Sequence, residues 1–365
     1  MRKIITLFTV LVLILSIAGT ASAVDFQEEL QKMAETNAKG YIGPFATAFG
    51  TAMNSGLYHN AKPHGMLGFD ISIKMAMVTV ADEDLTYDFL MPSLVLPVDP
   101  SFMVPNDELA IDINNVYKDR KTPTVFGSDE PDDFIADPAD AENALEQALL
   151  EAGKTQTDID NLKLTPAWAQ MLASLNSELN PIPRIPGIGI DVMPFVMPQV
   201  SVGLIRGTEV MLRFIPETDA GDIGKVNFLG IGIKHNIDQW IPIPLFPVKI
   251  SAQYVWQKLT VGDLLESNHT ALNVHVSKTV GFGVSITPYL GLGIESSNLI
   301  VKKYTIDNPN SSLHGQAIDE FKLDGDNSFR MTVGARFALP LVTINADYSL
   351  GEYSTFAAGL GITFR

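Results

Sequence analysis

The last residues of the chain alternate between large apolar side chains and small or polar ones. The closing segment from Ser354 to Arg365 reads STFAAGLGITFR, and Phe356, Leu360 and Ile362 share one face of it. A period of two is the repeat of a β-strand whose two faces meet different surroundings. Chain ends are usually frayed and polar, so an oily, patterned end indicates a strand with a partner.

The same period recurs along most of the second half of the chain and twice before it, at 67–79 and in roughly Leu85–Val95. It is clearest in the segments 67–79, 249–260, 271–280, 329–337 and 342–349. Short turns separate several of these segments, which is typical of an antiparallel up-and-down meander. We therefore predict an all-β fold of about 12 strands, with 14 as an upper count. The strands are expected to start near residues 66, 84, 198, 225, 246, 268, 283, 299, 318, 327, 341 and 353.

Alternation alone fits either a soluble β-sandwich or a transmembrane β-barrel, because both have one apolar and one polar strand face. Segments of about ten residues match the length of a tilted strand that crosses a bilayer. Aromatic residues lie near strand ends, as at Trp256, Tyr348 and Phe364. A sheet in lipid must also close on itself, and a terminal strand can do that. We predict an antiparallel up-and-down transmembrane β-barrel, with a soluble exported β-sandwich that binds ligand as the alternative.

The N-terminus has the features of a cleaved export signal. Arg2 and Lys3 precede an apolar run at 4–17, and Ala21-Ser22-Ala23 fits the small-x-small cleavage pattern. No later segment reaches the roughly 18 apolar residues of a spanning helix. We predict a signal peptide over 1–23 and a location in the bacterial outer membrane, with its lipid as a partner.

Two zones do not alternate. Residues 24–63 are expected to form an N-terminal helical plug of two short helices, separated at Gly43-Pro44. The barrel over 64–365 is expected to be interrupted by an acidic helical insertion at 97–197, in which Thr165-Pro166 caps a helix. If the last strand ends in the periplasm, counting strands back places this insertion on the periplasmic side or inside the lumen.

One expected strand is irregular. In the segment from Gln199 to Pro216, Arg206 shares a face with apolar residues, and an arginine at the bilayer centre costs roughly 2–4 kcal/mol. We expect a β-bulge at Gly207. The alternatives are two separate strands, or a strand that does not face lipid.

Composition excludes several functions. The chain has no cysteine, and without Arg2 and Lys3 the mature protein has 23 basic and 42 acidic residues, a net charge near −19. Nucleic-acid binding needs clustered basic residues, so we expect no nucleic-acid partner. The Gly-x-Gly pairs lack the third glycine of a dinucleotide site, and His59 and His64 lack a third metal ligand. We expect no enzyme activity, no catalytic residues, no metal and no cofactor.

Polar residues on the strands are the candidates for the barrel lumen. Such residues either tune which solutes pass or pair with a plug. Small lumen-facing glycines would leave room for that plug. The candidates are Asp70, Lys74, Gln253, Gln257, Arg330, Arg336, Asn345 and Asp347.

Three stretches resemble an uncharacterised family of exported bacterial proteins that carries a domain-of-unknown-function label. They are NSGLYHNAKPHGMLGFDISI from Asn54, PTVFG from Pro123, and PQVSVGLIRGTEVMLRFIP from Pro198. The resemblance implies an outer-membrane barrel loosely similar to long-chain fatty-acid transporters, and it supplies no functional residues. The expected function is passage or binding of a small solute, with hydrophobic solutes among the candidates. A sealed structural or surface barrel without transport is the alternative.

Overall fold

The computed structural model describes residues 24–219, 225–242, 247–262, 265–305, 317–318 and 320–364. The predicted signal peptide over 1–23 lies outside these residues. The chain divides into two compact units, one of residues 1–42 and 83–189, the other of residues 43–82 and 190–365. Helix α2 (Val24–Met53) contributes to both. Within the described residues, the helices are all too short or too polar to cross a bilayer.

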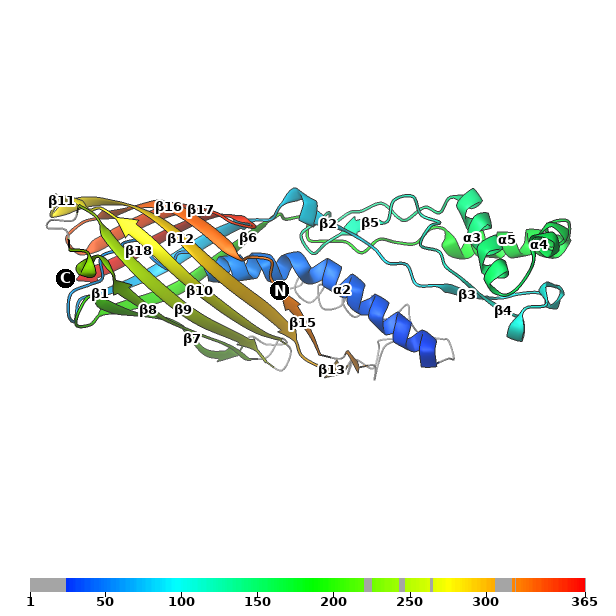
Figure 1. The fold of residues 1–365 in the computed structure, drawn as a ribbon, viewed down its shortest axis with the longest axis horizontal. Coiled ribbons are helices and arrows are strands. Elements are labelled where there is room, and N and C mark those ends of the chain that lie inside the picture. Colours follow the sequence, from blue (N-terminus) through cyan, green and yellow to red (C-terminus); the bar gives the residue numbers. More distant parts are fainter. Residues whose placement is uncertain are drawn as a thin grey trace. The chain divides into compact units, whose positions relative to one another are not determined.

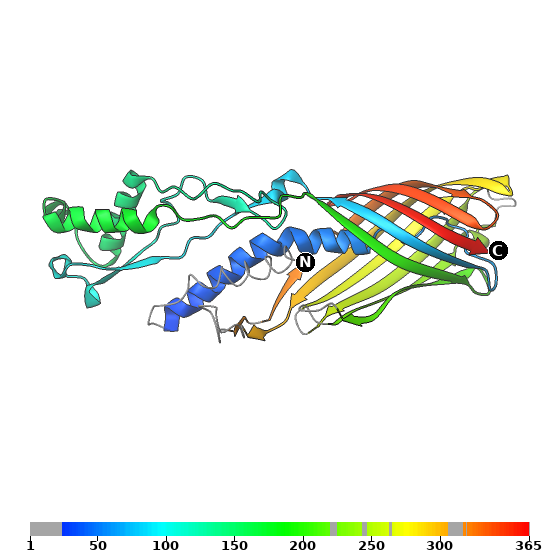
Figure 2. The same ribbon diagram turned by 180° about the vertical axis from the view of Figure 1, so that it is seen from behind.

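In the described part of the second unit, ten strands form a closed antiparallel barrel. Each strand pairs with the next one in the chain, β10 pairs with β12, and β18 pairs back with β1 (Figure 1). Figure 2 shows this seam, where the red β18 lies beside the light-blue β1. The strands are β1 (Phe69–Thr79), β6 (Val192–Gly203), β7 (Thr208–Asp219), β8 (Lys225–Asn236), β9 (Lys249–Val261), β10 (Leu265–Ser277), β12 (Val284–Val301), β16 (Phe329–Ala338), β17 (Val342–Leu350) and β18 (Ser354–Phe364).

The predicted all-β barrel is confirmed, with a smaller ring than expected. The sheet has twelve strands in the described residues, but β11 (Val280–Phe282) and β15 (Phe321–Asp324) are short strands that pair only with the two ends of β12, so ten close the ring. β13 (Tyr304–Thr305) and β14 (Ala317–Ile318) form a separate pair. The described strands close into a ring through the β1–β18 and β10–β12 pairings, which excludes the β-sandwich alternative, because a sandwich is built from two separate sheets.

Burial along the strands follows the alternation of the sequence. In β1, Ile71 and Ile73 are more than half exposed, whereas Asp70 and Lys74, on either side of them in the sequence, are buried. The same relation holds in β18, where Leu360 is exposed and Ala357 is buried. The barrel is therefore apolar outside and polar inside.

Two of the expected strands are not separate strands of the barrel ring. The segment near residue 84 forms β2 (Thr86–Asp88) and β3 (Leu94–Pro97), short strands that pair with β5 (Lys121–Pro123) and β4 (Glu108–Ile111) in the other unit. The strand expected to start near residue 299 is the continuation of β12, which runs for 18 residues. Local alternation cannot separate a short non-barrel strand from a barrel strand.

The irregular segment around Arg206 is a hairpin, so the expected bulge at Gly207 is wrong. β6 ends at Gly203 and β7 begins at Thr208. Arg206 and Gly207 have φ angles of 56° and 67°, and positive φ at both central residues is what a type I′ hairpin turn requires. The arginine thus lies in a turn at the barrel end and not at mid-strand.

The insertion leaves the barrel at the end opposite the C-terminus. Phe69 pairs with Phe364 at one end of the seam and Thr79 pairs with Ser354 at the other, and β6 starts beside Thr79. The sequence-based placement on the C-terminal side is therefore wrong, because one strand precedes the insertion and not two.

The N-terminal zone contains one helix where two were expected. α2 continues through Pro44 and ends at Met53, and the chain from Asn54 to Gly68 has no further helix or strand in the described structure. The residues of α2 from Gly43 onward belong to the barrel unit.

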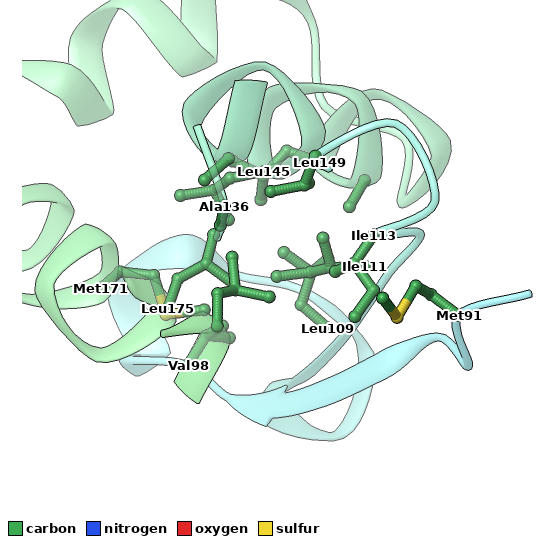
Figure 3. Close-up of a cluster of buried hydrophobic side chains, with 14 of the residues drawn as sticks. Met91, Val98, Leu109, Ile111, Ile113, Ala136, Leu145, Leu149, Met171 and Leu175 are labelled. Carbon is green, nitrogen blue, oxygen red and sulfur yellow. The ribbon is translucent and has the colours of Figure 1, made fainter. Parts of the chain in front are cut away.

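The first unit has a hydrophobic core of its own, built by α3 (Pro138–Glu151), α4 (Gln156–Lys163), α5 (Pro166–Leu179) and β4. Figure 3 shows side chains from α3, α5 and β4 that point toward one another in this core. Asp137 and Thr165 cap α3 and α5, each followed by a proline in the first turn, which confirms the expected cap at Thr165. The insertion is therefore a folded unit and not an extended acidic loop.

We expect the L145A substitution to destabilise the first unit by about 2–5 kcal/mol, because Leu145 is fully buried in this core and its truncation leaves a cavity. Guanidinium unfolding of the protein in a W240F/W256F background, followed by fluorescence of the remaining Trp168 in the same core, measures the change. L164A, at an exposed leucine, is the control. Equal unfolding midpoints for the two variants would contradict this core.

Candidate functional site: the plugged lumen

All eight lumen candidates lie on the inward face of the barrel. Each is buried, from Asp70 and Gln257 at 0% exposure to Arg336 at 8%. They come from four regions of the wall: β1, β9, β16 and β17. The sequence thus placed these side chains on the inward strand face, although their contribution to solute binding stays a prediction.

The end of α2 and the chain after it occupy the lumen. Figures 1 and 2 both show the C-terminal end of α2 inside the barrel. Met53 packs against Met197 and Phe228, and Leu57 packs with Met211 and Val255, all from the barrel wall. We call residues 43–64 the plug segment. Because its path starts at the mouth where β1 ends and leaves where β1 begins, it runs the length of the barrel.

Two arginines from different strands hold the helix end. Arg213 of β7 donates from Nη1 to the Met53 carbonyl and from Nη2 to the Ser55 carbonyl, both at 2.8 Å. Arg330 of β16 donates to the Thr51 carbonyl at 2.7 Å and to the Ser55 hydroxyl at 2.8 Å. The last carbonyls of a helix lack helical partners and carry partial negative charge, so cations are favourable there. We call Arg213 and Arg330 the arginine clamp.

The positive charges of the two clamp residues are compensated by different groups. Arg330 pairs with Glu295 at 3.0 Å, and both side chains are almost fully buried. Among the described residues no carboxylate pairs with Arg213, which instead donates to the side-chain oxygens of Gln199 at 2.9 Å and Gln257 at 3.3 Å. The helix end therefore supplies the main compensation for the buried charge of Arg213.

Glutamines of the wall add neutral contacts to the plug segment. Gln257 donates to the Met53 carbonyl at 3.0 Å. Gln253 and Gln199 both donate to the Leu57 carbonyl, at 3.3 and 3.4 Å. The barrel wall thus hydrogen-bonds the backbone of the plug segment both at the last residue of α2 and in the irregular chain beyond it.

The plug segment leaves the barrel through a second polar cluster. Glu209 accepts hydrogen bonds from the His64 backbone at 2.9 Å, contacts His64 Nδ1 at 2.8 Å, and pairs with Lys234 at 2.8 Å. His64 Nε2 lies 3.0 Å from the hydroxyl of Thr363 on the last strand. This cluster fixes the exit of the plug segment beside the β1–β18 seam.

His59 of the plug segment lies against Lys74 and Asp70. Lys74 Nζ is 3.0 Å from His59 Nδ1 and donates to Asn345 at 2.9 Å, while His59 Nε2 is 3.9 Å from Asp70. His59 and His64 therefore serve different polar clusters, and the described residues contain no group of three or more potential metal ligands.

Sequence reasoning missed Arg213, Glu209 and Glu295. Arg213 and Glu209 lie on β7, whose register was obscured by treating the 199–216 segment as one strand. Once Arg206 and Gly207 are read as a turn, Glu209, Met211 and Arg213 alternate on the inward face. That alternation is the signal that could have identified them.

A small residue on the wall makes room for Tyr58. The Tyr58 ring stacks on His275 with centroids 4.1 Å apart, and a Cβ added at Gly291 would lie 1.9 Å from the Tyr58 hydroxyl. The G291A substitution is therefore expected to displace Tyr58 and to cost about 1–3 kcal/mol, the usual range for overpacking. Unfolding midpoints in detergent measure the effect. G65A is the matched control, because nothing lies within 4 Å of its added methyl. Equal midpoints would contradict this packing.

Comparison with solved structures finds outer-membrane proteins at low similarity. One is OmpT of Vibrio cholerae, an outer membrane protein in its trimer form, with 11% identity and a TM-score of 0.24 over 46% of this chain and 56% of that one. The chain thus spans little more than half of that protein. Another is Ail, the attachment invasion locus protein of Yersinia pestis, with 13% identity and a TM-score of 0.20 over 43% of this chain and 95% of that one. No curated protein matches.

A family model matches nearly the whole chain. The match covers residues 1–364 and therefore includes both compact units and the plug segment. It confirms the resemblance that the three sequence stretches indicated. The chain belongs to the family of unknown function DUF6588.

Proposed function

We propose that this protein is an exported outer-membrane β-barrel, closed at rest by its own plug segment, which lets a small solute bind or pass when that segment moves. The signal at residues 1–23 would direct export and be removed. The barrel would contact membrane lipid with its outer face. The proposal includes no catalytic activity.

The observation that carries the membrane part is the apolar outer face of the closed ring. Exposed large hydrophobic side chains follow one another at every second position on neighbouring strands, such as Ile73, Leu360 and Ile344, which lie side by side. Water would make such a continuous apolar surface unfavourable, whereas hydrocarbon matches it. The polar inner face is the arrangement of a membrane barrel.

The observation that supports movement of the plug segment is its polar attachment. It is held by hydrogen bonds from Arg213, Arg330 and the glutamines, and each of these groups can be hydrated if the plug segment leaves. A permanently sealed barrel could be closed by side-chain packing alone. Asp70 and Arg336 also face the lumen without a hydrogen bond among the described residues to Asp70 Oδ1 or Oδ2, or to Arg336 Nε.

Conductance of the mature protein in planar bilayers tests the proposal. We expect the wild type to be closed for most of the time, with rare openings, and a variant lacking residues 24–55 to conduct continuously. Heat-dependent gel mobility shows in each case whether the barrel has folded. A folded deletion variant that stays silent would favour the alternative function, a sealed structural barrel whose lumen is filled by its own wall side chains.

A further inference from the structure

The two ends of the barrel differ in their surface chemistry. We call the end at which Phe364 lies the C-terminal mouth; its connections are 64–68, 204–207, 237–248, 278–283 and 339–341. Every one of these connections has at least one exposed large hydrophobic residue among its described residues. Those residues are Met66, Leu67, Leu204, Ile205, Trp240, Val280, Phe282, Leu339 and Leu341.

The connections at the opposite mouth lack this property. Outside the folded unit of residues 83–189, Ile190 is the single exposed large hydrophobic residue among their described residues. The outer faces of β9 and β10 also become polar before they reach that mouth, where Lys258 pairs with Glu266 at 2.8 Å. The apolar outer surface therefore has a polar border at one mouth and continues onto the turn tips at the other.

The two mouths of the barrel also differ in charge. At the C-terminal mouth Lys62, Arg206 and Lys278 are exposed, and the one acidic residue of its connections, Asp238, is buried and paired with Lys249 at 2.8 Å. The opposite mouth leads into residues 83–189, which contain 20 acidic and 6 basic residues, a net charge of −14. The C-terminal mouth is thus apolar and basic, whereas the chain leaving the other mouth is acidic.

The backbone of the apolar turns is suited to a medium with little water. Leu204 donates to the Thr208 carbonyl at 2.7 Å, and Leu339 donates to the Val342 carbonyl at 2.8 Å. Backbone groups in lipid must be paired within the protein, and these tight turns pair them. Trp240, at 68% exposure, is the residue type that prefers the boundary between headgroups and hydrocarbon.

We infer that the C-terminal mouth is immersed in the headgroup region of an anionic glycerophospholipid leaflet. The apolar turn tips reach the upper acyl chains, and Lys62, Arg206 and Lys278 bind lipid phosphates. Continuity with the apolar outer surface and the positive charge of this mouth both point to lipid as the occupant. This inference rests on the proposed membrane location and adds the orientation of the barrel: the acidic insertion leaves from the membrane face opposite the phospholipid leaflet.

Single-tryptophan variants of the mature protein test the immersion. W168F/W256F keeps Trp240 at the mouth, and W168F/W240F keeps Trp256 on the outward face of β9. Both are refolded in vesicles of equimolar phosphatidylcholine and phosphatidylglycerol that are brominated either near the headgroup or deep in the acyl chain. We expect Trp240 to be quenched most by bromine near the headgroup. Quenching of Trp256 but not of Trp240 would overturn the inference and leave the membrane barrel intact, whereas no quenching of either would overturn both.

A second arm tests the charge. Bromine is placed on phosphatidylglycerol alone or on phosphatidylcholine alone, and the ratio of the two quenching efficiencies reports which lipid surrounds Trp240. We expect enrichment of the anionic lipid of up to about five-fold per basic residue. The ratio should fall in K62Q/K278Q toward the smaller value that Arg206 alone supports, and stay at the wild-type value in K225Q/K322Q, whose lysines flank the opposite mouth. A wild-type ratio of one, or equal ratios in both variants, would overturn the role of these charges.

Discussion

The R213M/R330M variant is expected to conduct ions for most of the time in a planar bilayer that holds the wild type closed. The two guanidinium groups make four hydrogen bonds to the plug segment, three of them to backbone carbonyls in the last turn of α2 or just beyond it. Hydrogen bonds to charged groups contribute about 1.5–3 kcal/mol each. Loss of the arginine clamp should therefore raise the open population by at least about a hundred-fold. Single-channel recording measures that population.

Control variants separate loss of the clamp from a general loss of charge. K225M/K322M removes two exposed cations at the mouth opposite the C-terminal mouth, and among the described residues their ion pairs are with Glu217 and Asp324. It should stay closed. A folded R213M/R330M protein with wild-type conductance would show that the arginine clamp does not hold the plug segment.

The L360R substitution should prevent stable insertion of the barrel. Leu360 lies in the middle of β18 between Ile73 and Ile344, and all three are exposed on the outer face. An arginine near the middle of the bilayer costs about 2–4 kcal/mol, which falls to about 0–1 kcal/mol near the interface. Denaturant titration of the protein in lipid vesicles, with the folded fraction read from gel mobility, measures this cost.

T260R is the matched control for that experiment. Thr260 is on the outward face of β9, near the polar border that contains Lys258 and Glu266. Its arginine should stay close to headgroups and cost little. Equal losses for L360R and T260R would mean that the outer face is not in contact with a bilayer of that depth.

The barrel could be predicted from sequence because its strands have two faces in unlike surroundings, so the signal is local. The number of strands could not be predicted in this way. The segment from Leu85 to Val95 alternates well enough to look like a barrel strand, but it belongs to the other unit. Its misassignment also reversed the predicted side of the insertion, because each strand changes the side of the membrane.

The site was predictable only in part, for a related physical reason. The alternation of side chains along a strand shows which of them point inward. It identified Lys74, Gln257 and Arg330 correctly as buried inward residues. It does not identify their partners. Arg330 binds Thr51, 279 residues away, and Arg213 binds Met53, 160 residues away. Such pairs depend on the register of all ten strands and on the path of the plug segment, which no local pattern contains.

Gel mobility of the protein in fractionated cells tests most directly whether the closed ring is a membrane barrel. We predict that the full-length protein, expressed with its own signal in a Gram-negative host, is recovered in the outer-membrane fraction, extracted only by detergent, and migrates faster before heating than after. Recovery in the soluble periplasmic fraction, with the same mobility before and after heating, would contradict this account.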